Sequence, residues 1–183
     1  MRIISGKYKG KRLQAPKKLP VRPTTDMAKE ALFNILNNYY EFDELAVLDL
    51  FAGTGNISFE FASRGTENIV SVDKDYGCIK FIASVSRELD LNIKTFKDDV
   101  FKFLERNKMQ FDLIFADPPY DMAQVDFQKL VNLVFENELL SEEGILVVEH
   151  SKYSDLSGFP YYTEQRRYGG SVFSFFKATS VLK

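Results

Sequence analysis

The stretch Val47–Gly55 (VLDLFAGTG) places the tightest limit on what this chain can fold into. It begins as a buried strand, because residues 46–51 are apolar except for Asp49, and it then breaks into a glycine turn that a helical pattern follows. This order brings backbone N–H groups and a helix N-terminus to the carboxyl end of a strand, where open α/β sheets bind their ligands. The stretch therefore predicts a binding site at that edge of a sheet.

The glycine spacing discriminates between classes of ligand. Dinucleotide-binding turns carry G-x-G-x-x-G, but here Gly53 and Gly55 are followed by Ser58 in the third position. The missing glycine, with Asp49 upstream, disfavours NAD or FAD and favours a smaller adenosyl ligand without phosphates. Asp73 ends the next apolar run about 20 positions after Gly53, where a ribose-binding carboxylate is expected. The alternatives are a capping or loop-bracing role for Asp49 and a helix-capping role for Asp73.

Length and composition predict one domain, 1–183, with a substantial core, because the chain has 183 residues and is 45% apolar. Cys78 and His150 are the only residues of their types, so we expect neither a disulfide nor a metal site, and we interpret His150 as a strand-end histidine. No apolar run approaches the length of a membrane span, and the basic N-terminus lacks a signal-peptide apolar segment. These features favour a cytoplasmic protein, with a monomer as the default expectation.

The charge of the chain is unevenly distributed. Residues 1–29 contain nine Lys or Arg and one acidic residue, a net charge of +8, whereas the remainder carries −10. This asymmetry indicates a polyanion partner bound by one end of the molecule, and the alternative is a solvated basic arm. Tyr8 lies among the lysines and is a candidate to stack on a base.

Residues 1–40 predict a basic β-hairpin and a packing helix ahead of the main core at 41–183. Strand patterns at 2–5 and 11–14 flank a turn, and Pro16, Pro20 and Pro23 then keep the chain extended. Thr24 or Thr25 can cap the next helix. One apolar face of that helix is expected to pack the arm onto the sheet, and it consists of Ala28, Ala31, Leu32, Ile35 and Leu36.

From residue 45 onward strand and helix patterns alternate, which predicts an α/β fold with a doubly wound, mostly parallel sheet. The end of the chain differs, because the strand-like segments 161–167 and 171–179 meet at Gly169-Gly170 without a helix between them. They predict a hairpin whose last strand runs antiparallel to the sheet. The earlier strands are predicted at 46–51, 68–73, 92–96, 111–116 and 144–149, with helices at about 56–64 and 100–106 and around Ile82 and Leu130.

A second motif, Asp117-Pro118-Pro119-Tyr120, directly follows the predicted strand 111–116. Two consecutive prolines fix an extended backbone and remove two N–H donors, which leaves carbonyl groups facing outward. An aspartate, exposed carbonyls and an aromatic ring suit a planar ring that carries an exocyclic amino group. The amine would donate to Asp117 and to the Pro118 carbonyl while Tyr120 stacks on the ring, so that the nitrogen lone pair faces an electrophile.

The chain resembles class I S-adenosylmethionine-dependent methyltransferases that act on amino nitrogens. The motifs that carry this resemblance are, in order, Asp49–Gly55, Asp73 and Asp117–Tyr120. The N-terminal segments narrow the resemblance to the bacterial RsmD family, which methylates guanine N2 in small-subunit ribosomal RNA. It covers nearly the whole chain. The segments that carry it are Arg2–Gly10 (RIISGKYKG), Arg22–Asp26 (RPTTD) and Lys29–Leu36 (KEALFNIL).

The resemblance implies a Rossmann-like, seven-stranded sheet with an antiparallel last strand, S-adenosyl-L-methionine as cofactor, and ribosomal RNA of the small subunit or its assembly intermediate as partner. By position it implies that the target guanine lies at Asp117, Pro118, Pro119 and Tyr120. The cofactor residues would be Asp49, Phe51, Ala52, Gly53 and Gly55 around the methionine part, Asp73 beside Lys74 at the ribose, and Asp99 and Val100 at the adenine. The basic residues expected to contact RNA are Lys7, Lys9, Lys11, Arg12 and Arg22.

Two alternatives remain open at this point. The Asp117–Tyr120 chemistry also serves DNA adenine-N6 or cytosine-N4 methylation, although 183 residues leave little room for a target-recognition region. Methylation of protein glutamine fits less well, because the basic arm favours a polyanion. The non-enzymatic alternative is an RNA-binding ribosome-assembly module. One departure from the family is Gly170, which stands after Tyr168-Gly169 where the family usually has an acidic residue.

Overall fold

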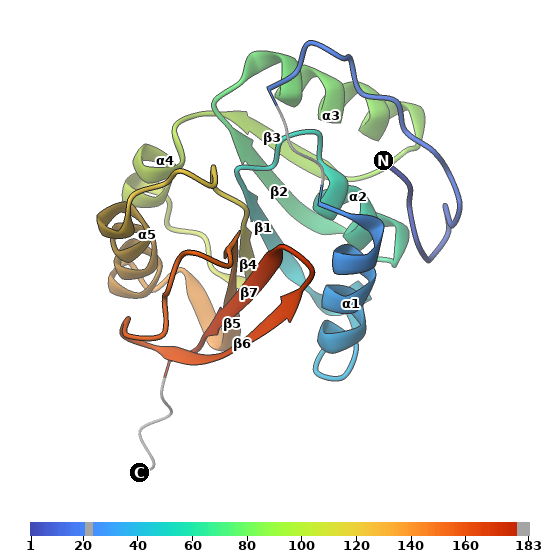
Figure 1. Ribbon diagram of the computed structural model, residues 1–183. Coiled ribbons are helices and arrows are strands. Elements are labelled where there is room, and N and C mark those ends of the chain that lie inside the picture. Colours follow the sequence, from blue (N-terminus) through green and yellow to red (C-terminus); the bar gives the residue numbers. More distant parts are fainter. Residues whose placement is uncertain (21–23, 179–183) are drawn as a thin grey trace.

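A seven-stranded sheet forms the middle layer of the molecule in a computed structural model that describes residues 1–20 and 24–178 (Figure 1). The strand order is β3-β2-β1-β4-β5-β7-β6. The strands are β1 Ala46–Leu50, β2 Asn68–Asp73, β3 Ile93–Lys97, β4 Phe111–Ala116, β5 Leu140–Ser151, β6 Tyr162–Tyr168 and β7 Ser171–Phe176. The helices are α1 Asp26–Leu36, α2 Asn56–Ser63, α3 Tyr76–Glu88, α4 Val100–Arg106 and α5 Gln124–Glu136, with a 3-10 turn η1 at Phe42–Glu44.

The strand directions confirm the predicted topology. Strands β1 to β5 run parallel to one another, whereas β7 pairs antiparallel with both β5 and β6. The predicted start of the fifth strand at Gly144 was wrong, because Leu140 already pairs with Phe111 across a register shift. Strand β7 ends at Phe176 instead of continuing to Thr179, which itself lies outside the described residues.

Helices cover both faces of the sheet. On one face, α4 and α5 pack over β1, β2, β4 and β5 in a core that includes Phe103, Leu104, Phe127 and Val131. On the other face, α1 and α2 pack Leu32, Phe33 and Phe61 against β1, β4, β5 and β7, and α3 joins α2 and the N-terminal arm in a smaller cluster. Within the described residues, no helix is long and apolar enough to cross a membrane.

The predicted N-terminal hairpin forms, but only as a single β-bridge between Arg2 and Arg12. Backbone bonds join Ile3 to Lys11 and to Gly10 across the turn. Its outer edge pairs with α2 instead of another strand: the N–H groups of Ile4 and Ser5 donate to the Glu60 carboxylate. These bonds to a side chain take the place of a regular ladder, so the arm is docked onto α2 as an irregular loop.

Helix α1 begins after Thr25, whose hydroxyl accepts from the Ala28 N–H, as predicted. Its buried face differs from the predicted one. Ala28, Leu32 and Leu36 are buried as expected, but Ala31 and Ile35 are only half-buried, and Lys29 and Phe33 are fully buried in their place. The apolar pattern could not include Lys29, because a lysine is not expected on a buried face.

Lys29 is buried because it has charged and polar partners. Its ammonium lies 3.1 Å from Glu60 Oε2 and donates to the Arg2 carbonyl and to Asn56 Oδ1. Burial lowers the pKa of Lys29, and the Glu60 carboxylate opposes that shift. Lys29 is one of the nine basic residues counted in segment 1–29, but it holds the arm against α2 from inside the protein instead of facing a polyanion partner.

His150 lies within β5, one residue before its end, and is buried. Its Nε2 is 2.8 Å from Ser174 Oγ and its Nδ1 is 2.9 Å from the Ser151 carbonyl oxygen. Burial lowers its pKa, so it is neutral at physiological pH. The interpretation as a structural histidine of a strand fits these contacts.

Glu60→Gln is expected to destabilise the fold by about 3–5 kcal/mol, because it removes one partner of a buried ion pair and leaves Lys29 uncompensated. Urea unfolding monitored by circular dichroism measures the loss, and amide exchange of Ile4 and Ser5 should accelerate together with it. The matched control is Glu88→Gln, which removes an exposed pair with Lys11 and should cost less than about 1 kcal/mol. Equal losses in the two variants would contradict the anchoring role of Glu60.

Candidate active site

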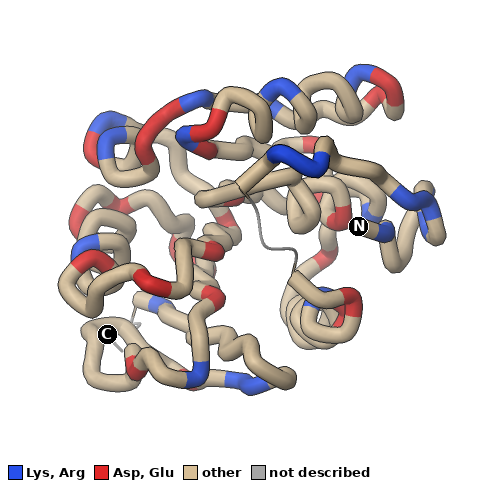
Figure 2. The backbone as a smooth tube through the Cα atoms, turned by 45° about the horizontal axis from the view of Figure 1, so that its top comes forward, with Lys and Arg blue, Asp and Glu red and all other residues tan. Residues whose placement is uncertain are grey.

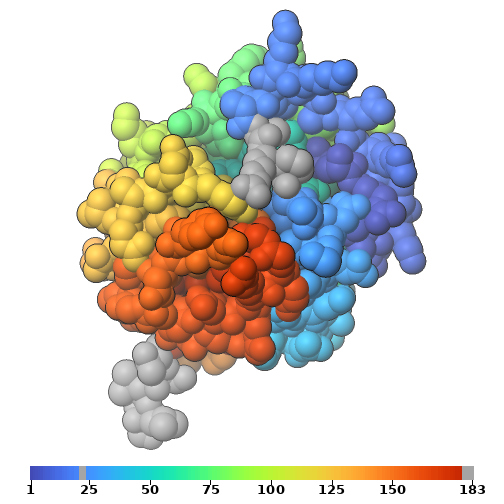
Figure 3. Space-filling model, in the orientation of Figure 1, coloured from blue at the N-terminus to red at the C-terminus, as the bar shows by residue number. Residues whose placement is uncertain are grey.

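A cavity of about 590 Å³ opens at the carboxyl ends of the central strands. Strand β1 pairs with β2 on one side and with β4 on the other, so the chain reverses its direction of winding between β1 and β4. Ligands of open α/β sheets bind at this kind of switch point. Figure 3 shows that the N-terminal segment, the segment after β4 and the C-terminal hairpin meet on one face of the molecule.

The glycine turn after β1 is tightly constrained. Phe51 has a φ of 55°, in the left-handed region that side chains rarely adopt, and lines the cavity. Gly55 has a φ of 79°, and a Cβ atom there would lie 2.8 Å from Ile82 Cγ1. Gly55 is therefore required by the turn and by α3, and it does not itself line the cavity, whereas Ala52 and Gly53 do.

Asp73 is held in place by two backbone N–H groups. Its Oδ2 accepts from Gly53 and its Oδ1 accepts from Asp75, both at 2.8 Å. Asp75, not Asp73, caps α3 through the Cys78 N–H, so the capping alternative for Asp73 is wrong. Each carboxylate oxygen keeps a further acceptor position for a hydroxyl donor. Lys74 lies beside Asp73 at the cavity wall.

Asp49 is buried and is braced by α2. Its Oδ2 accepts from the Ser58 N–H at 3.1 Å and from the Ser58 hydroxyl, whose oxygen is also 2.7 Å from Ser71 Oγ. Burial raises the pKa of Asp49 to about 7, which the Ser58 bonds oppose and the Asp73 charge reinforces. Ser58, which replaces the third glycine of dinucleotide-binding turns, is thus the partner of this carboxylate.

Asp99 and Val100 form the adjoining wall at the start of α4. Asp99 Oδ1 accepts from the Lys102 N–H at 3.1 Å and caps the helix. Val100 is buried, and its neighbour Phe101 also lines the cavity. This apolar wall beside a carboxylate suits a flat, partly polar ring.

The segment after β4 supplies the opposite wall, where Asp117, Pro118, Pro119 and Tyr120 all line the cavity. The Asp117 N–H donates to the Leu50 carbonyl, which fixes the start of the segment against β1. The Pro119 carbonyl accepts from Met122 N–H, so it closes a turn and does not face outward as predicted. The Tyr120 hydroxyl lies 3.3 Å from Ser171 Oγ.

The structure adds residues that the pattern of the sequence did not single out. Glu149, near the end of β5, is 2% exposed and lines the cavity together with Thr24 and Ser171. Thr24 and Ser171 both donate to its carboxylate. A signal was present, since Glu149 follows an apolar run near the end of its strand, as Asp49 does near the end of β1. Its partners come from residues far away in the chain, and only the fold shows them.

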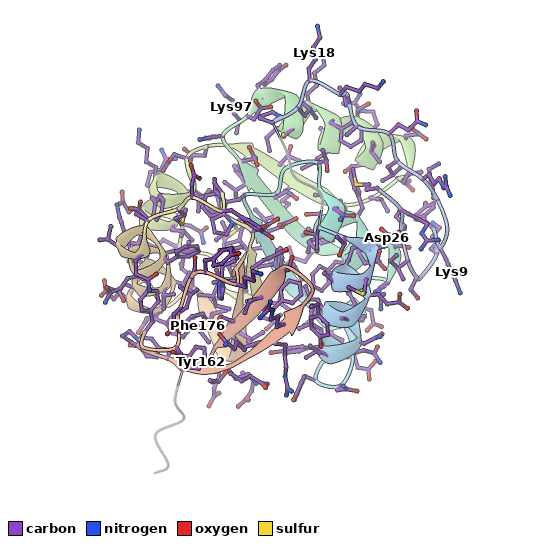
Figure 4. The ribbon with its side chains drawn as sticks, in the orientation of Figure 1. Lys9, Lys18, Asp26, Lys97, Tyr162 and Phe176 are labelled. Carbon is purple, nitrogen blue, oxygen red and sulfur yellow. The ribbon has the colours of Figure 1, made fainter. Side chains whose placement is uncertain are left out.

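Four of the predicted RNA-binding residues, Lys7, Lys9, Lys11 and Arg12, lie on the N-terminal arm, outside the cavity lining. Lys7, Lys9 and Arg12 are exposed, whereas Lys11 pairs with Glu88. Figure 2 shows basic positions along this arm, and Lys9 and Lys18 point away from the body of the molecule in Figure 4. Arg22 lies outside the described residues.

Tyr8 has a structural contact that its prediction as a base-stacking residue did not foresee. Its hydroxyl donates to the Leu89 carbonyl, and its ring packs beside a buried cluster beneath the arm. The Lys7 ammonium lies 5.2 Å from the ring centroid. The ring therefore helps to dock the arm onto α3.

Asp49 is expected to make the stability of the fold depend on pH. Because its folded pKa of about 7 lies above the ordinary value, its contribution is fully present below about pH 4 and is lost as the pH rises toward about 7. The free energy of unfolding of the wild type minus that of Asp49→Asn should therefore fall across this range and then level off. Urea titrations at several pH values measure this difference, and a constant or rising difference would contradict the raised pKa.

Comparison with known proteins identifies the family. A family model described as "Conserved hypothetical protein 95" matches residues 1–177. YlbH of Bacillus subtilis is 37% identical over 161 residues, which is 85% of each chain. "Ribosomal RNA small subunit methyltransferase D" of Escherichia coli K12 is 29% identical over 168 residues, covering 87% of this chain and 79% of the relative.

Solved structures agree with this assignment. A hypothetical protein of Thermus thermophilus is 29% identical, with a TM-score of 0.83, and the alignment covers 97% of this chain and 99% of that one. A 16S rRNA methyltransferase of the same organism, solved with AdoMet and guanosine, is 20% identical with a TM-score of 0.70 over 87% of this chain and 45% of its own, and shows the shared fold. The chain belongs to the family of the matching model, the RsmD family of ribosomal RNA methyltransferases.

Proposed function

We propose that this enzyme transfers a methyl group from S-adenosylmethionine to the exocyclic N2 of a guanine in small-subunit ribosomal RNA. The relatives named ribosomal RNA small subunit methyltransferase D support this substrate class. The observation that carries the proposal is the single cavity that joins two motifs far apart in the chain. Asp73 and the glycine turn line one part of it, and Asp117–Tyr120 line another.

The residues of the first part fit an S-adenosylmethionine molecule. Asp73 would accept the ribose hydroxyls, since its carboxylate is already oriented by Gly53 and Asp75. Val100 and Asp99 would contact the adenine. Asp49 also lines the cavity, and a positive charge on the methionine part of the cofactor would favour the ionised form of the Asp49 carboxyl group. When bound, this cofactor supplies an electrophilic methyl group on a sulfonium, so that direct attack by an amine needs no covalent enzyme intermediate.

The residues of the second part would hold the target base. Asp117 and the Pro118 carbonyl would accept the two N–H bonds of the guanine amine, and Tyr120 would stack on the ring. Holding both hydrogens turns the nitrogen lone pair toward the methyl group, and good alignment of two reactants can supply roughly 7–11 kcal/mol. Asp117 would also stabilise the positive charge that develops on N2. A paired guanine must first leave its stack, which costs a few kcal/mol.

The division of labour we propose assigns RNA binding to residues 1–40 and catalysis to 41–183, within one domain. The basic side chains of the arm would contact phosphates beside the cavity mouth. They are the exposed Lys7, Lys9 and Arg12, together with Lys11. Because a small domain with one short arm has little surface for reading sequence, we propose a particle of RNA and protein as the substrate and a monomer as the active form.

The proposed reaction is tested with labelled S-adenosylmethionine and three acceptors: unmodified small ribosomal subunits, the same RNA without protein, and DNA. Digestion to nucleosides and mass spectrometry should identify N2-methylguanosine, formed fastest from the particle. N6-methyladenine or N4-methylcytosine in DNA would reassign the substrate. Absence of both product and cofactor binding would favour a non-enzymatic assembly module.

Asp117→Ala is expected to lower methyl transfer by about a hundredfold or more, because it removes the acceptor that orients the amine and stabilises its developing charge. Cofactor affinity, measured by calorimetry, should stay within about twofold, since Asp73 and the glycine turn are untouched. Asp121→Ala is the matched control: it is exposed, lies on the same segment and does not line the cavity. Equal loss of transfer and cofactor affinity in Asp117→Ala would refute this role.

Reversing the charges of Lys7, Lys9 and Lys11 to Glu is expected to weaken RNA binding and to leave cofactor affinity unchanged. The salt dependence should also become shallower, with the slope of log K against log salt reduced by about two to three. Filter binding at several salt concentrations measures both effects. The control reverses Lys102, Lys108 and Lys129, three exposed lysines on or beside α4 and α5. RNA affinity that does not change in the arm variant would mean that the arm is only solvated.

A further inference from the structure

Four side chains from separate parts of the chain form a line of hydrogen bonds at the cavity wall. Tyr120 Oη lies 3.3 Å from Ser171 Oγ, and Ser171 Oγ donates to Glu149 Oε1 at 2.7 Å. Thr24 Oγ1 donates to the other oxygen, Glu149 Oε2, at 3.0 Å. The line therefore joins the segment after β4, the start of β7, the end of β5 and the residue that precedes the cap of α1.

The direction of these bonds follows from counting hydrogens. A serine hydroxyl carries one hydrogen, and that of Ser171 is donated to Glu149. In its contact with Tyr120, Ser171 can therefore only accept, so the tyrosine O–H must be the donor. The carboxylate of Glu149 thus fixes the direction of both bonds, and a charged acceptor at the end of such a line strengthens the bonds before it.

Burial makes this arrangement costly unless it is complete. Glu149 is 2% exposed and Ser171 is 8% exposed, and a carboxylate at this depth requires donors. Parallel pairing of β4 with β5 brings Ala116 beside Val148, so Asp117, just after β4, and Glu149, within β5, are the next residues along the two neighbouring strands. Glu149 therefore lies next to the segment that would hold the base.

We propose that Glu149 and Ser171 are positioning residues that hold the ring of Tyr120 at the place where it can stack on the target guanine. This inference rests on the proposed function, because it assigns the ring its stacking role. The hydroxyl contact restrains displacement of the outer end of the ring, and the short bond from Ser171 to Glu149 keeps the serine in place. Thr24 secures the far side of the same carboxylate.

The first test compares Ser171→Ala, Tyr120→Phe and the double variant in single-turnover methyl transfer. The contact between Tyr120 and Ser171 is long for two hydroxyl groups, so we expect each single variant to lower the rate only about three- to tenfold. The double variant should be no slower than the slower single variant, because both changes break one link. Ser171→Thr, which keeps the hydroxyl, should restore most of the rate. Cofactor affinity should not change.

Ser141→Ala is the matched control, since Ser141 also donates to a carboxylate, Asp112, at 2.7 Å and lies near the other end of β5, away from the cavity. A loss of rate in Ser141→Ala as large as that in Ser171→Ala would show a general effect on stability and overturn the proposal. Multiplying losses in the double variant would also overturn it, because Ser171 would then act by a route other than Tyr120.

The second test does not depend on activity. Protein labelled with 3-fluorotyrosine gives a fluorine resonance for each of the nine tyrosines, and the one lost in Tyr120→Phe belongs to Tyr120. Ser171→Ala should shift that resonance, whereas Ser141→Ala should not. If wild-type protein methylates no guanine N2, the proposed function fails, and a shifted resonance would still support the link. An unshifted resonance would overturn the link whatever the activity.

Discussion

The buried carboxylate of Glu60 is the contact on which the placement of the N-terminal arm depends. It accepts bonds from the N–H groups of Ile4 and Ser5, and it pairs with Lys29 of α1 and with Arg64 beyond α2. A carboxylate at this depth is tolerated only when its acceptor positions are filled. One side chain therefore fixes the arm, the first helix and the second helix relative to each other. The same rule applies to Asp49, which accepts bonds from Ser58. It also applies to Glu149 at the cavity wall, which accepts bonds from Thr24 and Ser171.

Much of the site could be predicted because it is built from motifs that are local in the chain. A strand, a glycine turn and a helix position Asp49 and Gly53 by short-range geometry, and Asp73 follows at the end of the next strand. Parallel strands end at one edge of a sheet, so these residues and Asp117 were expected to meet, and they line one cavity. The roles of these residues toward cofactor and base remain proposals that the experiments above test.

Two features were missed because a charged or an aromatic side chain has a partner distant in sequence. Lys29 was counted among the nine basic residues of segment 1–29, although it is buried beside Glu60, and the predicted buried face of α1 left it out. The bond that the Tyr8 hydroxyl donates to Leu89 was not foreseen either, and stacking of its ring on a base stays a prediction. Pattern analysis reads polarity along the chain, and it contains no information on which distant group will neutralise a buried charge.

The sequence alone determined the alternation of strands and helices, the glycine turn, the antiparallel last hairpin and the family. Each of these follows from the spacing of residues close together in the chain or from a short motif. Only the tertiary structure decided which carboxylates are structural and which face the cavity. It also decided that Thr24, Tyr120, Glu149 and Ser171 form one hydrogen-bonded line. The physical reason is that hydrogen bonds and ion pairs between distant residues depend on angstrom-scale geometry, which exists only after the sheet has assembled.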